Sequence, residues 1–232
     1  DARGTLGADG TGWWVSLDAG FERAGLDEVL ALWPVAGEEK SRRWVATHIE
    51  GGAVHDGTLA FRKAADGKLK MNGTFGVEGP VVRPLKGLAP ITVAQGYVSL
   101  APERVAIAAE AAALTAPDGA PLDLSGTTYL IPSGPAAKRA GPDKVGTLNL
   151  ALSGGIRSVL SVLGEEPFTV FDGLDETLGA DMARGQAVAK GRITIPLKPG
   201  EMAVNDVHYD ISARLSDVSS DVLIPDKLLV AE

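Results

Sequence analysis

Cysteine is absent from the 232-residue chain, and histidine occurs only three times. Without cysteine the protein has no disulfide bridges, no thiolate metal site and no cysteine nucleophile. The chain also has no G-x-S-x-G nucleophile elbow, no P-loop and no G-x-G-x-x-G fingerprint. These absences remove the usual sequence signals of hydrolases and nucleotide-binding enzymes. We therefore expect that the protein is not an enzyme and that it uses no cofactor.

Excess positive charge and long hydrophobic runs are missing as well. Lys and Arg number 22 against 30 Asp and Glu, so the net charge is -8 and no basic stripe can follow a nucleic-acid backbone. The longest apolar stretch, residues 105–116, contains Glu110 and is shorter than the ~20 residues of a membrane-spanning helix. The chain begins at Asp1 without an initiator methionine, and we expect it to be a piece of a longer protein.

The chain is rich in segments that alternate apolar and polar residues. From residue 53 to residue 116 such segments are separated by Gly, Pro and Asp-Gly, which predicts consecutive antiparallel strands. Asp66-Gly67 favours a hairpin turn, and residues 131–146 are predicted to form a long loop. A sheet this apolar must close into a sandwich or a barrel, or curl around a bound apolar ligand. We predict a mostly β protein: a curved antiparallel sheet that forms an open groove, with a few short packing helices.

Three segments instead show helical spacing of apolar residues. They are residues 26–33, 41–49 and 155–163. The first two are expected to form a helical packing element near residues 26–50, which closes one end or flank of the sheet. Trp33 and Trp44 would be its large apolar anchors. The alternative is that the element caps an ordinary sandwich core.

A metal site would have to use the few histidines. His48, His55 and Asp56 are the candidates, but the pattern does not place them on one face of an element. Histidines at solvated or capping positions are the simpler interpretation. We therefore expect no metal site.

Three late segments place large apolar residues on one face of predicted strands. These residues are Leu148, Leu150 and Leu152; Ile193, Ile195 and Leu197; and Val207, Tyr209, Ile211 and Leu215. Several of them are predicted to line an apolar groove. An ordinary core remains the alternative, because core and groove positions show the same alternation.

The order of motifs along residues 26–215 resembles the AsmA-like envelope proteins, and within them the central domain of the large YhdP type. The motifs are Trp33-Pro34, Trp44, Gly51-Gly52, "FGVEGPVVRPLKGLAPITVAQGYVSL", "LALSGGIRSVLSVL" and "GQAVAKGRITIPL". AsmA-like and TamB-like proteins resemble bridge-like lipid transfer proteins, in which β-sheets curl into a long gutter with an apolar floor.

This resemblance implies that residues 1–232 are a single groove-forming segment of a longer AsmA-like protein. The apolar groove would bind and conduct phospholipids between the inner and outer membranes, in support of outer-membrane lipid homeostasis and barrier integrity. The implied location is the periplasm, with the full-length protein anchored in the inner membrane. The implied partners are phospholipid acyl chains and neighbouring segments of the same full-length chain. The alternative is a passive β-sandwich scaffold or adhesion module of the cell envelope that conducts no lipid.

Overall fold

Strands dominate the computed structural model of the protein, which describes residues 1–33, 39–65, 67, 69–141, 144–174, 178–197, 207–222 and 229–231. The described strands are β1 (Ala2–Asp9), β2 (Gly12–Gly25), β3 (Ile49–Glu50), β4 (Ala53–Lys63), β5 (Lys70–Glu78), β6 (Val81–Val82), β7 (Ile91–Ala101), β8 (Arg104–Thr115), β9 (Pro121–Asp123), β10 (Thr128–Pro132), β11 (Val145–Gly155), β12 (Arg184–Pro196), β13 (His208–Ser220) and β14 (Leu229–Ala231). The described helices are α1 (Leu26–Leu32), α2 (Glu39–His48), α3 (Gly134–Ala140), α4 (Ile156–Gly164) and the short 3-10 helix η2 (Ala180–Met182).

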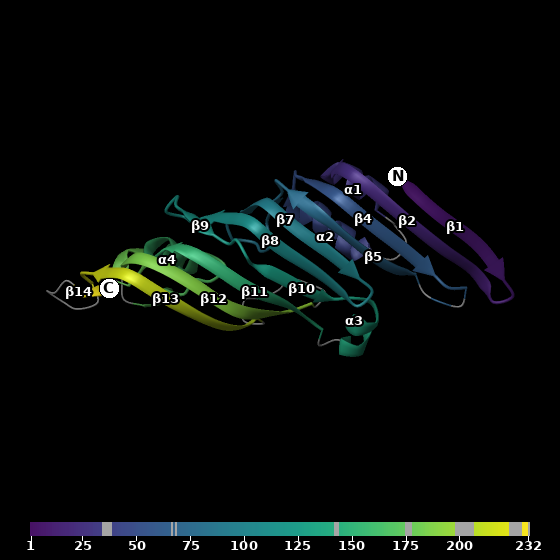
Figure 1. The fold of residues 1–232 in the computed structure, drawn as a ribbon. Helices are drawn as coiled ribbons and strands as arrows, with labels where there is room; N and C mark the ends of the chain where they lie inside the picture. The colour runs from purple at the N-terminus through teal and green to yellow at the C-terminus, as the bar shows by residue number, and fades with distance from the viewer. Residues whose placement is uncertain are drawn as a thin grey trace.

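The 14 described strands form one antiparallel sheet, which runs the length of the molecule (Figure 1). The main path is β1-β2-β4-β5-β7-β8-β10-β11-β12-β13-β14, so each strand of this path pairs with the next strand of the path along the chain. The short strands β3, β6 and β9 pair beside this path. This meander confirms the predicted fold class, a mostly β protein built on a curved antiparallel sheet with few helices.

Successive antiparallel strands return the chain alternately to the two rims of the sheet. The connections that contain α1, α2, α4 and η2 all fall on one rim, which we call the helical rim. The opposite rim consists of the β1–β2, β4–β5 and β7–β8 turns together with α3, and we call it the hairpin rim. The two rims therefore differ in how much structure they place over the sheet.

The three predicted helices are present with small changes of boundary. The predicted ranges 26–33, 41–49 and 155–163 correspond to α1, α2 and α4. The predicted loop 131–146 was wrong in part, because it contains α3. Pro135 stands in the first turn of α3, where its missing N–H costs nothing, and Gly141 ends the helix with a φ of 61°.

The predicted hairpin around Asp66-Gly67 joins β4 to β5, which pair antiparallel. Gly67 donates a backbone hydrogen bond of 3.0 Å to the Ala64 carbonyl, while Asp66 lies outside the described residues. The pairing was therefore correct, although the connection spans residues 64–69 and is longer than a two-residue turn.

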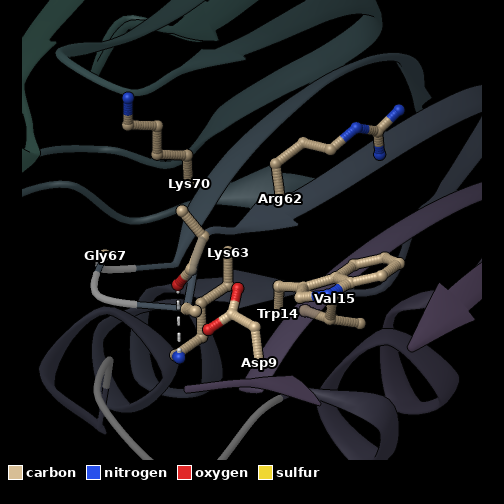
Figure 2. A pocket seen from close by; sticks show the side chains of 9 residues that line it. Asp9, Trp14, Val15, Arg62, Lys63, Gly67 and Lys70 are labelled. Atoms are coloured by element: carbon tan, nitrogen blue, oxygen red, sulfur yellow. Dashed lines mark hydrogen bonds between the residues drawn. The ribbon is translucent and has the colours of Figure 1, made fainter. Parts of the chain in front are cut away.

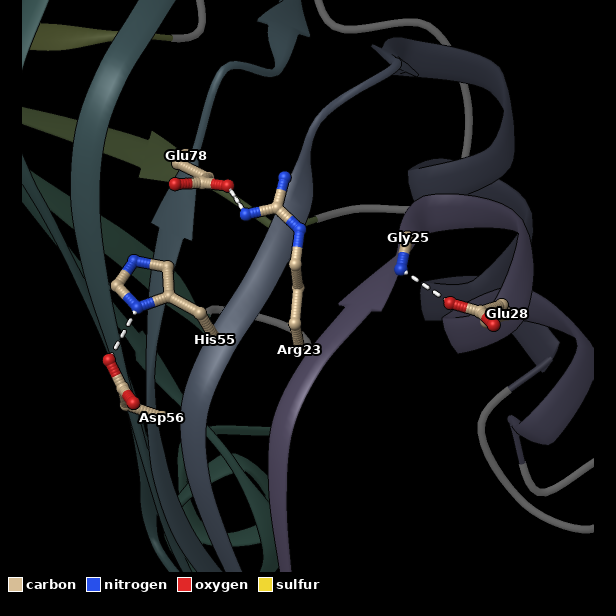
Figure 3. Close-up of polar contacts among 6 residues, drawn as sticks. All are labelled: Arg23, Gly25, Glu28, His55, Asp56 and Glu78. Atoms are coloured by element: carbon tan, nitrogen blue, oxygen red, sulfur yellow. Dashed lines mark hydrogen bonds and ion pairs between the residues drawn. The ribbon is translucent and has the colours of Figure 1, made fainter.

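Register shifts bend the sheet near the helical rim. They occur in β4 between His55 and Thr58, in the β7–β8 pair near Gln95, and in β12 between Arg184 and Gln186. Figure 3 shows the first of them, where Asp56 has a φ of 49° and its carboxylate lies 2.9 Å from His55 Nδ1. Bulges increase local twist and bend the bulged strand. Their common position is consistent with the curved sheet.

The polar contacts in Figure 3 also explain how the chain leaves the sheet for α1. Glu28 accepts a hydrogen bond of 2.8 Å from the backbone N–H of Gly25. Arg23 on β2 forms an ion pair with Glu78 on β5, across the intervening strand β4. The first contact holds the start of α1 against the end of β2, and the second ties the end of β2 to β5.

The sheet is open rather than folded into a compact body. Its accessible surface is 14800 Å², whereas a compact monomer of 23.9 kDa would expose about 9,900 Å². The buried core is small and lies at the helical rim, where Leu122 has only 1% of its surface exposed. Among the described residues, most of the sheet therefore has no second layer over it.

Both ends of the sheet present free strand edges within the described residues. β1 pairs only with β2, and β13 pairs with β14 only over Val218–Ser220, so its outer edge from His208 to Asp217 is open. Open edges are templates for pairing with another chain. We therefore expect concentration-dependent self-association of the isolated chain in sedimentation velocity experiments.

Leu6→Pro tests this prediction. Asp1 and Gly20 exchange both backbone hydrogen bonds, so the alternation of the ladder directs the Leu6 N–H to the outer edge. Proline there removes an outward donor without breaking a bond to β2, and it should shift the protein toward monomer. Leu6→Thr is the control, since it removes the apolar side chain but keeps the N–H. Equal self-association of wild type and Leu6→Pro would contradict pairing through the β1 edge.

Candidate functional site: the apolar face of the sheet

The register brings together candidate residues that lie far apart in the sequence. Leu148 on β11 pairs with Ile193 on β12, and Ile193 pairs with Tyr209 on β13. Directly paired residues of an antiparallel sheet point to the same side. We call the side that carries these residues the apolar face.

The other candidates follow the same face. Leu150 pairs with Gly191, which pairs with Ile211, and the side chain of Ile211 lies against Gly191 where a Cβ atom would clash. Leu152 and Ile195 continue their strands at the same two-residue spacing, as does Leu215. Leu197 and Val207 lie just beyond the ends of β12 and β13, and both are half-buried.

The apolar face extends well beyond the predicted residues. From Phe75 the register passes through a residue of every main strand to β13. This apolar row consists of Phe75, Val98, Ile107, Tyr129, Leu148, Ile193 and Tyr209. Sequence reasoning missed its first four members, although the alternation in residues 91–101 and 104–115 could have identified two of them.

No member of the apolar row is buried. Ile107 is 38% exposed and Tyr209 is 72% exposed, and the other members are half-buried by their neighbours within the sheet. In a filled core the same positions would lie below a second layer and lose contact with water. The row is therefore a continuous apolar strip on an open surface.

Aromatic rings near the row make its surroundings apolar. Phe21 and Phe75 lie with their ring centroids 6.3 Å apart, tilted by 48°. Burial against the sheet raises the pKa of the Tyr129 hydroxyl. Tyr129 also lies over Gly146, a position where any side chain would collide with the ring. The Tyr129 ring therefore occupies the space that a side chain at position 146 would take.

The opposite face of the same strands is polar. Thr128, Asn149, Arg192 and Asp210 form a row across β10 to β13, and Asn149 Nδ2 donates to Thr128 Oγ1 at 3.1 Å. Among the first strands, Arg62 pairs with Asp18 at 2.6 Å. Across β10 to β13 this row makes one side of the sheet more polar than the other.

Helix α4 covers one end of the apolar face. Val159 and Val162 of α4 pack against the buried cluster around Leu122, together with Leu150 and Leu152. Candidates near the helical rim are therefore partly covered. The middle and hairpin-rim parts of the face lack such a cover in the described portion of the chain.

Two polar contacts hold α4 in place. Ser158, which is buried, donates a hydrogen bond of 2.8 Å to Asp118 in the β8–β9 turn. Arg157 forms an exposed ion pair of 2.7 Å with Asp181. The backbone N–H of Ala120 and the Ser158 hydroxyl both favour the charged carboxylate, so the pKa of Asp118 lies below its ordinary value.

Asp118→Ala should therefore loosen α4 in a pH-dependent way. A lowered pKa contributes stability above the pKa of the unfolded state and loses it as the pH falls through the folded pKa. We expect a lower Tm than wild type at neutral pH, and a difference that shrinks below about pH 4. Asp181→Ala removes the same charge from an exposed pair and should change the Tm much less. A difference from wild type that persists in acid would contradict this role of Asp118.

The helical packing element near 26–50 differs from its prediction. Trp44 is 44% exposed and stacks on His48 with ring centroids 4.8 Å apart, so it is not a buried anchor. Trp33 is half-buried, and Arg42 Nε ties α2 to α1 through a 3.1 Å hydrogen bond to the Leu30 carbonyl.

The metal candidates do not assemble in the described part of the chain. His48 Nδ1 lies 2.9 Å from the Trp44 carbonyl, and His55 is paired with Asp56. No group of three or more His, Cys, Asp or Glu side chains is arranged to hold a metal ion among the residues with a described position. Within those residues, no helix is both long and apolar enough to cross a membrane.

Comparisons with known proteins give the chain no family. No family model, no curated protein and no solved structure matches it.

Proposed function

We propose that the apolar face binds phospholipid acyl chains. The observation that carries the proposal is the apolar row, which crosses the strands from β5 to β13 without a single buried member. Large contiguous apolar surfaces are rare on proteins that function alone in water. Each methylene that leaves water is stabilised by about 0.8 kcal/mol, so an acyl chain gains strongly from lying on this face.

The dimensions suit such a ligand. The apolar row crosses β5, β7, β8 and β10 to β13, and strands lie ~4.8 Å apart, which gives the row a length of roughly 30 Å. This length accommodates acyl chains laid along the sheet, across the strands.

The motif order that resembles AsmA-like proteins supports a wider proposal. The chain is a groove-forming segment of a longer periplasmic protein anchored in the inner membrane. Its groove conducts phospholipids toward the outer membrane and so supports lipid homeostasis and barrier integrity there. Neighbouring segments of the full-length chain would continue the apolar face past the open edges of β1 and β13.

A photo-crosslinking residue at position 211 tests acyl binding directly. Ile211 lies on the apolar face, whereas its neighbour Ser212 lies on the polar face and donates to the Lys190 carbonyl. We expect a crosslinker at position 211 to capture phospholipid and one at position 212 to capture none. Native mass spectrometry of gently purified protein should show lipid adducts. A passive scaffold predicts no adducts and equal, negligible crosslinking at both positions.

A further inference from the structure

We propose that the hairpin rim at the N-terminal end of the sheet docks on a bilayer surface that contains anionic phospholipid. The docking tip consists of the described residues of the β1–β2 and β4–β5 turns and of the strand ends beside them, and we call it the tryptophan tip. It includes Trp13, Trp14, Lys63, Leu69 and Lys70. This inference does not depend on acyl binding by the apolar face.

The two turns form one structural unit. Val15 on β2 pairs with Lys63 on β4, and the backbone of Gly12 lies against the Ala65 carbonyl. Lys63 Nζ donates to the Trp13 carbonyl at 2.8 Å and to the Ala64 carbonyl at 3.4 Å. The lysine therefore holds the tip of one hairpin against the tip of the next.

The tip exposes large apolar side chains to water. Trp13 is 64% exposed, Leu69 is 57% exposed and Leu6 on the adjacent strand is 68% exposed. The indole ring of Trp14 fills the space over Gly7. Tryptophan prefers the boundary between water and the acyl region, because its ring is large and apolar while its N–H needs a polar partner.

Cations surround the same tip. Trp14, Arg62 and Lys70 line a hollow of about 700 Å³ together with Asp9, and Figure 2 shows these side chains. Thr11 satisfies the Asp9 carboxylate through hydrogen bonds from its N–H at 2.8 Å and its hydroxyl at 2.5 Å. Lys70 has no ion pair within the described residues. Its ammonium group is thus available to a phosphate headgroup.

Charge complementarity identifies the occupant. The whole chain carries a net charge of -8, which would repel an anionic bilayer from most of its surface. At the tryptophan tip Arg62 is already paired with Asp18, which leaves Lys63 and Lys70 beside the Asp9 carboxylate among the described lining residues. Lys and Arg beside exposed tryptophan are typical of segments that bind anionic lipid surfaces. An acidic protein surface would satisfy the lysines but would leave Trp13 and Leu69 without an apolar environment.

The hairpin rim itself supplies a contrast. The β7–β8 turn, Pro102-Glu103, contains neither tryptophan nor lysine, and its Glu103 pairs with Arg139 of α3 at 2.8 Å. The tip features are therefore not shared by the β7–β8 turn of the same rim.

Vesicle flotation tests the proposal with the whole chain. We expect wild type to float with vesicles of phosphatidylethanolamine and phosphatidylglycerol, and to remain unbound with vesicles of phosphatidylcholine alone. Trp13→Thr and Lys70→Gln should each lower the partition coefficient about fivefold or more, as expected from losing one interfacial contact. Trp44→Thr and Lys190→Gln change an exposed tryptophan and an exposed lysine outside the tip, and should bind as wild type does.

Ile211→Asp separates this proposal from the proposed function. If the tip docks the protein, this variant still floats with the anionic vesicles even if it no longer captures acyl chains. If vesicle binding is lost in Ile211→Asp but kept in Trp13→Thr, the apolar face causes it and the tip proposal is wrong. Absence of flotation by folded wild type would overturn it too, as would binding to acidic peptides in place of vesicles. Acyl crosslinking that fails while flotation succeeds would overturn only the proposed function.

Discussion

Ile211→Asp is expected to abolish capture of acyl chains while the fold stays nearly intact. Ile211 is 43% exposed, so the new carboxylate reaches water when no lipid is bound and destabilises the protein little. A bound acyl chain would cover that carboxylate, and the cost of its desolvation opposes binding. Crosslinking of a photoactivatable phospholipid should fall by at least about tenfold, which corresponds to about 1.4 kcal/mol. Circular dichroism and the Tm should match wild type.

Ser212→Asp is the matched control for this experiment. It places the same charge on the same strand, one residue away and on the polar face. Its lipid capture should equal that of wild type. Equal loss in both variants would mean that added negative charge repels the probe in general, and the apolar face would lose its support as the binding surface.

Leu122→Asp is expected to have the largest effect on stability. Leu122 is 1% exposed in the cluster between α4 and the ends of β8, β9 and β11. Leu122→Ala alone should cost about 2–5 kcal/mol, and an unpaired buried carboxylate costs more. Since domains of this kind are stable by only ~5–15 kcal/mol, the aspartate variant should be largely unfolded under mild denaturant.

Leu150→Asp and Ile195→Asp extend the comparison along the sheet. Leu150 packs against the same buried cluster, so Leu150→Asp should lower the stability strongly. Ile195 lies near the hairpin rim, outside this cluster, so Ile195→Asp should lower the stability less. Chemical denaturation of Leu122→Asp, Leu150→Asp and Ile195→Asp, with Ile211→Asp for comparison, measures how the loss of stability changes along the sheet. If Ile211→Asp, Leu150→Asp and Ile195→Asp all unfold the protein, the strands enclose a core and the lipid proposal fails.

Local features of the fold were predictable from local patterns. The helical spacing of Leu26, Val29 and Leu30 and of Ile156, Val159 and Leu160 marks α1 and α4, because burial of one helix face requires that spacing. The two-residue alternation of Leu148, Leu150 and Leu152 marks β11 for a similar reason. The α3 helix escaped prediction because "SGPAAKRAG" is rich in Pro and Gly, which favour turns as well as helix starts and stops.

The alignment of site residues that lie far apart in the sequence depends on the register of the strand pairs. Alternation places Val98, Ile107 and Tyr129 on one face of their own strands, but only the pairing of β7, β8 and β10 aligns them with Leu148. A shift of one residue would have put them on the polar side. The tryptophan tip likewise required the β4–β5 turn to lie beside the β1–β2 turn.

By itself, the amino-acid sequence determined that this protein is a strand-rich chain with three amphipathic helices and strands that are apolar on one side. Only the tertiary structure decided whether those sides meet each other or face outward. The physical reason is that a strand face packed inside a core and a strand face covered by a bound ligand both require apolar residues at the same two-residue spacing. Ile211 and Leu122 look equivalent as apolar strand residues in the sequence, yet one is 43% exposed and the other 1% exposed.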